Sequence, residues 1–346
     1  MGLNDMNFNI DELLKNKDLK PVSDFFDKSN EPLISVFCLT YNQEKYIRDA
    51  LDSFLSQLVD FNVEIVVHDD ASTDSTPDIL KEYAKKYPNV VKVFFEKENQ
   101  YSRVGDTIEI ERMHIKNAHG KYIASCEGDD YWIDPYKLYL QAYALENNQN
   151  CNFCIHRVNI NDLRTGDNTA VLPSIKLSSS IIESEKFIDL VNSDYPFQTS
   201  CYFMRKHMYE QFLDEYPLYA QTMPTSDEAV MYYFGNAGDV FFVDRVMSCW
   251  RKFTENSWNE TNLIKSTSKE RNARRRKFAE SIMQFYEYSG RRFESCIERY
   301  NRLMITTYLS ENNLKALFSS KALKKTLRKQ GLVRYCKLRI KSMFVK

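Results

Sequence analysis

Glycine is scarce in this 346-residue sequence, with nine residues against a usual share of roughly 7%. No glycines are spaced as GxGxxG or GxxxxGK[ST], which excludes the dinucleotide-binding fingerprint and the Walker P-loop in their usual forms. The sequence also lacks any run of 18 uninterrupted apolar residues, which excludes a membrane-spanning helix. Six acidic residues lie within the first 30 positions, unlike a signal peptide, so we expect a cytoplasmic protein.

Paired metal-binding cysteines are absent as well. The eight cysteines are scattered, and only Cys151 and Cys154 form a CxxC pattern. A second pair or a CxxH pattern would be needed to complete a tetrahedral zinc site. Both cysteines flank Phe153 in an apolar run, which favours buried free thiols.

Charge is distributed unevenly along the chain, although the formal net charge is only −1. Residues 1–260 hold 25 Lys and Arg against 42 Asp and Glu, whereas residues 261–346 hold 22 against 6. The segment 318–346 has ten basic residues and no acidic one. We expect it to bind an anionic membrane surface or to dock on the acidic part of the chain. Among its basic residues lie Leu323, Leu327, Leu332, Val333 and Ile340, which would form the apolar face of an interfacial helix. No nucleic-acid-binding motif accompanies it, so we expect no nucleic acid partner.

The hydrophobic pattern from residue 33 onward alternates between strand-like and helix-like segments. Apolar residues at 47, 50, 51, 54, 55 and 58 follow helical spacing, and Thr76-Pro77 is typical of a helix start. The predicted strands are 33–40, 63–67, 90–95, 122–126, 151–159, 197–204 and 240–246. Alternating strands and helices predict an α/β fold, with a mostly parallel sheet flanked by helices.

Polar residues follow three of these strands, where ligands of parallel sheets bind. Thr40 and Asn42 follow the first strand, Asp69 and Asp70 the second, and the sequence Glu127-Gly128-Asp129-Asp130 follows the fourth. Carboxylates that converge on one edge repel each other unless a cation or hydrogen-bond donors hold them. A hard divalent ion with oxygen ligands meets that need, and it would in turn bind a phosphate.

Three segments resemble the family 2 glycosyltransferases of the GT-A fold. They are Ile34–Asn42, Glu64–Thr76 and Glu127–Trp132. Two later segments, Pro224–Glu228 and Val246–Arg251, resemble the acceptor half of bacterial surface-polysaccharide glycosyltransferases. The resemblance covers residues 32–258.

The resemblance implies a nucleoside diphosphate sugar donor, an Mn²⁺ or Mg²⁺ ion, and inverting transfer to a hydroxyl of a glycan or lipid-linked acceptor. Thr40 and Asn42 match the loop that lines the nucleotide, and Asp70 matches the residue that accepts hydrogen bonds from the base. Asp129 and Asp130 match the acidic pair of the family, in which one residue binds the metal and the other helps to bind the ribose or donor. The resemblance does not assign these two roles between them. Glu127 stands where the family often has Asp and is not assigned as a ligand.

Two further residues are candidates for acting directly on the reacting groups. Asp227 matches the catalytic base position, with Glu228 as the rival, and a helix cap is the structural alternative for Asp227. Arg251 is a candidate for a charge-assisted contact to the diphosphate. A carboxylate base would take the proton from the acceptor hydroxyl.

The expected organisation is a lead-in at 1–30, a GT-A domain at 31–258 and a helical basic region at 259–346. Within the domain, 31–135 would form the nucleotide-sugar half and 136–258 the acceptor half. We expect a metal-dependent glycosyltransferase of surface-polysaccharide synthesis. A protein or lipid glycosyltransferase, and an inactive nucleotide-sugar-binding scaffold, are the alternatives.

Overall fold

The computed structural model describes residues 10–15, 17–104, 107–177, 179–194, 197–255, 257 and 260–327. These residues form two compact units. The sheet unit takes in those within 1–187, 196–215 and 233–254, and the helical unit takes in those within 188–195, 216–232 and 255–346. The expected domain boundaries at 31, 136 and 259 stay a prediction.

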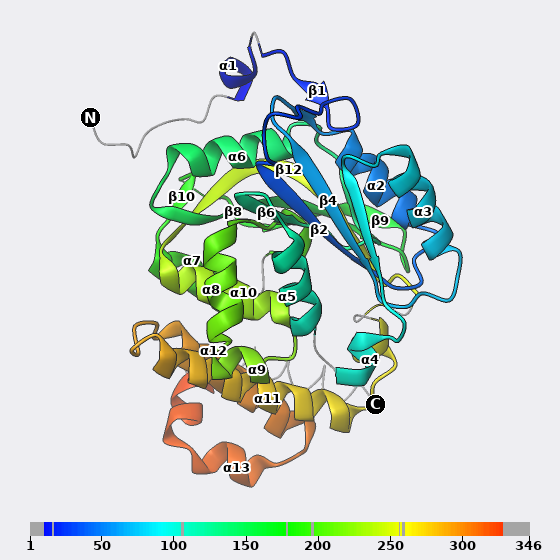
Figure 1. Ribbon diagram of the computed structural model, residues 1–346. Coiled ribbons are helices and arrows are strands. Elements are labelled where there is room, and N and C mark those ends of the chain that lie inside the picture. Colours follow the sequence, from blue (N-terminus) through cyan, green and yellow to red (C-terminus); the bar gives the residue numbers. More distant parts are fainter. Residues whose placement is uncertain are drawn as a thin grey trace, which may run out of the picture. The chain divides into compact units, whose positions relative to one another are not determined.

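A ten-stranded sheet forms the centre of the sheet unit in the described part of the chain (Figure 1). The strand order is β10-β12-β8-β11-β6-β2-β4-β5, with β7 paired to β12 and β9 paired to β8. The bounds are β2 Ile34–Thr40, β4 Val63–Asp69, β5 Val91–Phe95, β6 Tyr122–Ser125, β7 Tyr131–Trp132, β8 Cys151–Asp162, β9 Asp167–Leu172, β10 Ile181–Ile182, β11 Phe203–Arg205 and β12 Asp239–Lys252. A separate two-stranded sheet joins β1 (Lys20–Pro21) to β3 (Leu58–Val59).

Strands β6, β2, β4 and β5 are mutually parallel, as are β8 and β12. Every residue of β4 is buried, and its apolar stretch at residues 65–67 is typical of parallel strands, which are covered on both faces. The antiparallel strand β11 lies between the two parallel groups. The predicted α/β class, with a sheet flanked by helices, is confirmed.

The predicted strand at 197–204 is wrong in its first half. Residues Thr199–Cys201 form a 3₁₀ turn, and β11 begins only at Phe203. The Gln198 side chain accepts a hydrogen bond from the Ser200 N–H and so caps this turn. The polar residues Gln198, Thr199 and Ser200 thus form and cap the turn, and the strand begins only after them.

Helix α2 of the sheet unit buries one apolar face. Helix α2 buries Ile47, Ala50, Leu51, Phe54 and Leu55, as the helical spacing predicts, whereas Leu58 belongs to β3. Helices α2 and α3 lie side by side (Figure 1). The bounds are α1 Ile10–Leu14, α2 Ile47–Leu55, α3 Thr76–Lys86, α4 Gln100–Val104, α5 Ile108–Asn117, α6 Lys137–Asn147 and α8 Lys206–Glu215.

Helices dominate the helical unit, as expected for the basic C-terminal region. The bounds are α9 Leu218–Thr222, α11 Ser268–Tyr288, α12 Ser295–Ser310 and α13 Leu314–Ser319, with a π-helical turn at Glu260–Ile264. Helices α7 (Ser184–Asp194) and α10 (Ser226–Ala237) divide their residues between the two units. Thr267 and Glu270 form a capping box that fixes the start of α11.

A small apolar core holds α11, α12 and α13 together. It contains Ala279, Met304, Ile305, Leu309, Leu317 and Leu323. Seven of the ten basic residues in 318–346 lie outside the described residues. Among the residues that are described, no helix is long and apolar enough to cross a membrane.

Candidate functional site

The acidic loop, residues 126–130, leaves the carboxyl end of β6 and packs against the end of β2. The Gly128 N–H donates to the carbonyl of Leu39 at 2.9 Å. A methyl group on Gly128 would lie 2.5 Å from Gln43 Oε1 and 3.0 Å from Thr40 Cβ. Glycine therefore suits this close approach, because with any other residue either the neighbouring side chains or the loop itself would have to move.

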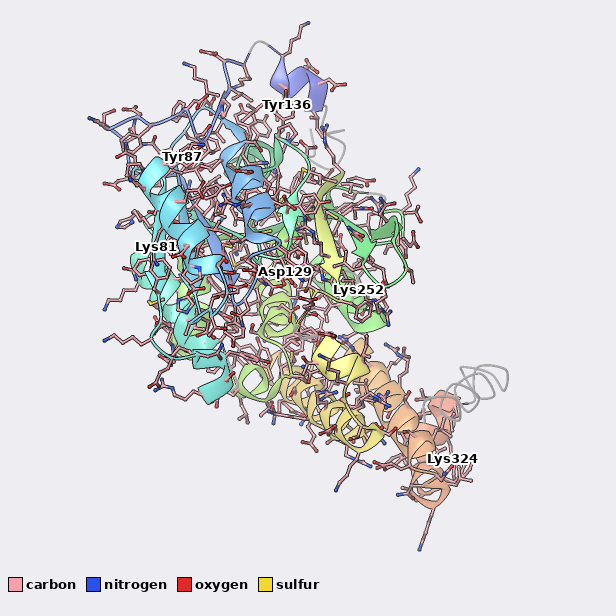
Figure 2. All side chains as sticks on the ribbon, turned by 90° about the vertical axis from the view of Figure 1, so that its right-hand side faces the viewer. Lys81, Tyr87, Asp129, Tyr136, Lys252 and Lys324 are labelled. Carbon is pink, nitrogen blue, oxygen red and sulfur yellow. The ribbon has the colours of Figure 1, made fainter. Side chains whose placement is uncertain are left out.

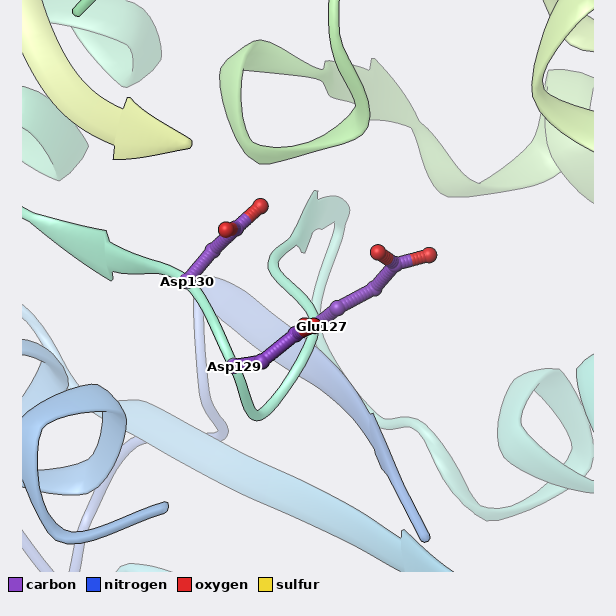
Figure 3. Close-up of side chains that lie close together, drawn as sticks. All are labelled: Glu127, Asp129 and Asp130. Atoms are coloured by element: carbon purple, nitrogen blue, oxygen red, sulfur yellow. The ribbon is translucent and has the colours of Figure 1, made fainter. Parts of the chain in front are cut away.

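Three carboxylates of the acidic loop gather at one place (Figure 3). One oxygen each from Glu127, Asp129 and Asp130 lies within 4.8 Å of the other two. Glu127 is exposed, whereas Asp129 and Asp130 are 8% and 1% exposed. Figure 2 shows Asp129 in its place within the sheet unit.

Burial raises the pKa of both Asp129 and Asp130 above the usual range, and the charges of Asp129 and Glu127 raise that of Asp130 further. A cation among the three oxygens would remove this repulsion. The donor set is all carboxylate, which fits Mn²⁺ or Mg²⁺ and disfavours soft metals. The structure thus brings together Asp129 and Asp130, as predicted, and adds Glu127.

The Asp130 carboxylate has a protein donor on each oxygen. Oδ1 accepts from the backbone N–H of Arg251 at 2.8 Å, and Oδ2 accepts from Gln198 Nε2 at 2.8 Å. On Asp129, Oδ2 accepts from the Thr254 hydroxyl at 2.6 Å. These donors lie 68 to 125 residues away in the sequence. Gln198 and Thr254 belong to no motif, so no sequence pattern pointed to them.

Arg251 lies beside the acidic loop, where a diphosphate contact was expected. Its guanidinium donates to the backbone carbonyl of Asp129 at 2.9 Å and pairs with Asp49. It also lies over the ring of Tyr131, 4.3 Å from the centroid. In this structure Arg251 thus braces the acidic loop, and its contact to a diphosphate stays a prediction.

Thr40 and Asn42 end β2 next to the acidic loop. The Thr40 hydroxyl donates to Gln43 Oε1 at 2.8 Å. Asn42 has a positive φ of 52°, which asparagine tolerates better than most residues. Its N–H donates to Ser72 Oγ, and its Oδ1 accepts from the Thr73 N–H. The Asn42 side chain therefore ties the turn after β2 to the turn after β4.

Asp70 follows β4 and is 5% exposed. Its backbone N–H donates to the Thr40 carbonyl, which places it at the same edge of the sheet. Its two carboxylate oxygens accept from the N–H groups of Gln100 and Tyr101, at 2.6 and 3.1 Å. Each oxygen keeps a further lone pair for a ligand donor. The predicted contact to a base stays a prediction.

Asp227 begins α10 in the helical unit, where it is half-buried. Its Oδ1 accepts from the N–H of Glu228 at 3.0 Å. Glu228 is 8% exposed and pairs with Arg299 at 2.9 Å, and Arg299 also donates to the hydroxyl of Tyr232. Burial raises the pKa of Glu228 to about 7 against the opposing effect of Arg299. Glu228 thus has an internal partner, whereas the base role of Asp227 stays a prediction.

Known proteins with similar sequences include putative glycosyltransferases. A family model described as "Glycosyl transferase family 2" matches residues 35–213, which include the acidic loop. Two putative glycosyltransferases of Bacillus subtilis are similar over part of the chain. EpsH is 39% identical over 104 residues (30% of this chain, 28% of EpsH), and the teichuronic acid biosynthesis enzyme TuaG is 37% identical over 102 residues (30% and 38%).

An uncharacterized Mycobacterium tuberculosis protein is 41% identical over 127 residues, 37% of this chain and 35% of that protein. The matched segments therefore span only about a third of these relatives.

Solved structures agree in fold. S. aureus TarS residues 1–349 with UDP-GlcNAc aligns over 80% of this chain and 72% of its own, with a TM-score of 0.51 and 18% identity. A mannosyltransferase of Pyrobaculum calidifontis, solved with GDP-Man and Mn²⁺, aligns over 96% and 87%, with a TM-score of 0.52 and 14% identity. At such identities the likeness establishes the fold alone, and the predicted GT-A architecture is confirmed.

Proposed function

Because the chain belongs to glycosyl transferase family 2 and is therefore a glycosyltransferase, as its motifs predicted, we propose that it uses a nucleoside diphosphate sugar, specifically a UDP-sugar. The acceptor is a hydroxyl of a glycan or lipid-linked glycan in surface-polysaccharide synthesis. The name of TuaG, a putative teichuronic acid biosynthesis glycosyltransferase, and the UDP-GlcNAc complex of TarS support this substrate class. The observation that carries the proposal is the carboxylate cluster of the acidic loop.

The residues that would hold Mn²⁺ or Mg²⁺ are Asp129 and Asp130, with Glu127 as a third oxygen donor. A divalent cation bound there would neutralise the leaving diphosphate. Thr254 and Gln198 donate hydrogen bonds to Asp129 and Asp130, respectively.

The remaining roles divide between the nucleotide and the acceptor. Asp70 accepts hydrogen bonds from the base, and Thr40 and Asn42 line the nucleotide. Asp227 takes the proton from the attacking hydroxyl, which makes that oxygen a better nucleophile. Direct attack of the hydroxyl on the sugar carbon inverts its configuration. We place the reaction in the cytoplasm, where nucleotide sugars are available.

Thermal melting of the full chain with a panel of nucleoside diphosphates tests the donor site, in Mn²⁺ and in chelator. A nucleotide at 100 times its Kd stabilises the folded state by about 2.7 kcal/mol. We expect UDP to raise the Tm only with Mn²⁺, and Asp129→Asn to abolish that rise. Asp78→Asn, an exposed position on α3, is the matched control and should respond like the wild type. No rise with any nucleotide would contradict the proposed donor site.

A second proposal is that the helical unit binds anionic membrane surfaces. Between residues 312 and 327 no acidic residue occurs, and Lys315, Lys321, Lys324 and Lys325 are exposed. Lys324 is labelled in Figure 2. Leu314 and Phe318 are also exposed, at 39% and 47%. Basic residues beside exposed apolar ones are typical of interfacial helices.

The sequence suggested that Leu323 and Leu327 would face the membrane. Leu323 is instead 5% exposed and packs in the core of the helical unit, with Leu327 against it. Truncation at 318 would therefore disrupt that core. The other residues of the expected apolar face lie outside the described residues. They are Leu332, Val333 and Ile340.

Charge reversal is the cleaner test. We expect Lys324→Glu with Lys325→Glu to lower binding to vesicles containing phosphatidylglycerol roughly 10-fold or more, since each lysine near such a surface contributes about 1 kcal/mol. The adjacent exposed pair Lys85 and Lys86 on α3, changed in the same way, is the control. Equal loss in both double variants would argue against a specific basic surface.

A further inference from the structure

The Gln198 side chain is a buried amide in direct contact with the acidic loop. It is 6% exposed, and its Nε2 donates to Asp130 Oδ2 at 2.8 Å. It reaches Asp130 from the 3₁₀ turn that precedes β11, 68 residues farther along the chain. The family motifs of the sequence do not include it.

The neighbours of Gln198 determine which way its amide faces. The backbone N–H of Ser200 donates to Gln198 Oε1 at 2.7 Å, and the Ser200 hydroxyl donates to the same oxygen. An N–H can only donate, so the oxygen must face Ser200 and the NH₂ group must face Asp130. The Ser248 hydroxyl, 2.8 Å from that of Ser200, extends this buried chain into β12.

The second oxygen of Asp130 is fixed independently. Its Oδ1 accepts from the backbone N–H of Arg251 on β12 at 2.8 Å. Donors from two different segments therefore fix the plane of the Asp130 carboxylate. Each of its two oxygens keeps a further lone pair for a cation. Thr254, which bonds Asp129, gives that neighbour only a rotatable hydroxyl.

We infer that Gln198 is a positioning residue, which holds the Asp130 carboxylate in the orientation that binds a divalent cation. The inference rests on the proposed function, because it assigns a partner to that metal site. Groups that orient a metal ligand contribute to affinity through geometry, and their loss costs about 10–100-fold in metal binding.

The test is Mn²⁺ binding to the full chain without nucleotide, measured from the electron paramagnetic resonance signal of the free ion. Gln198→Met keeps the side-chain length but removes the donor. Gln198→Asn keeps an amide for Ser200 that is one methylene too short for Asp130, and it serves if the first variant fails to fold. We expect each to raise the Kd for Mn²⁺ 10–100-fold.

Gln57→Met is the matched control. Gln57 is also buried in the sheet unit, at 1% exposed, and it bonds only backbone groups, including those of Asp134 and Leu138. Gln57→Met should lower the Tm about as much as Gln198→Met does. It should leave the Kd for Mn²⁺ within two-fold of the wild-type value. Equal loss of Mn²⁺ affinity in both variants would overturn the inference.

Asp130→Asn separates failure of this inference from failure of the proposed function. If it weakens Mn²⁺ binding while both Gln198 variants bind like the wild type, Gln198 is only structural and the metal site stands. If the wild type itself binds no Mn²⁺, the metal site fails and the inference fails with it.

Discussion

Replacing Gly128 with alanine should damage both the fold and the metal site. The new methyl would lie 2.5 Å from Gln43 Oε1, 2.9 Å from Ile47 Cδ1 and 3.0 Å from Thr40 Cβ. All three distances are shorter than ordinary non-bonded contacts, so either these side chains or the acidic loop must move. The loop also carries the three clustered carboxylates, so its displacement would change their spacing.

The expected cost follows from two contributions. Overpacking by one methyl costs typically 1–3 kcal/mol. Moving Gln43 also breaks its hydrogen bond with the Thr40 hydroxyl, worth about 0.5–1.5 kcal/mol. We therefore expect Gly128→Ala to lower the free energy of unfolding by about 2–4 kcal/mol in urea denaturation followed by circular dichroism, and to weaken Mn²⁺ binding about 10-fold or more.

Gly120→Ala is the matched control, because its methyl would lie 2.4 Å from the backbone N of Ser35, near the opposite end of β2. It should lose stability to a similar or greater extent, yet the folded protein should keep its Mn²⁺ affinity. Wild-type stability together with wild-type Mn²⁺ affinity in Gly128→Ala would refute the argument from close approach.

The remaining predictions concern the proposed base and acid stability. Asp227→Asn should keep the UDP-dependent rise in Tm but lose roughly 10²–10⁴-fold in sugar transfer. Glu228→Gln should instead mainly destabilise the helical unit at pH values above about 7, where Glu228 is ionised, because it leaves Arg299 buried without its charged partner. Wild-type transfer by Asp227→Asn would move the base role elsewhere. Burial, with a smaller effect of His68, lowers the pKa of His114 to about 3, so its folded-state pKa lies below the unfolded value. The stability that neutral His114 provides is present above about pH 6.5 and lost as the pH falls toward 3, by at most about 5 kcal/mol. His114→Phe should flatten the unfolding free energy over that range, and exposed His207→Gln should not.

Much of the sheet and its binding edge could be predicted from local sequence. The parallel strands β2, β4 and β6 are largely buried, so each contains a short apolar stretch and ends in a polar residue. Since parallel strands end at one edge, the convergence of Thr40, Asp70 and the acidic loop follows from the chain order. Helix α2 could be predicted for a similar reason, because its buried positions repeat with helical spacing.

The partners of those residues could not be predicted from local sequence. Gln198 and Thr254 contact the aspartates from segments 68 and 125 residues away, and neither lies in a motif. The 3₁₀ turn at Thr199–Cys201 was mistaken for strand, since residue types alone do not reveal that the Gln198 side chain accepts a hydrogen bond from the Ser200 backbone. Leu323 was expected to face a membrane, because the surrounding sequence does not reveal the apolar core of the helical unit in which it is buried.

The order of strands and helices and the family follow from local sequence, because they depend on patterns within short windows. The tertiary structure was needed to show that Glu127 joins Asp129 and Asp130, that Arg251 bonds the acidic loop, and that Glu228 is paired with Arg299. The first depends on how the acidic loop is folded, and the other two on contacts between segments that the packing of the chain brings together. Hydrogen bonds and ion pairs require separations of about 3 Å, and no local pattern fixes such a distance across a hundred residues of chain.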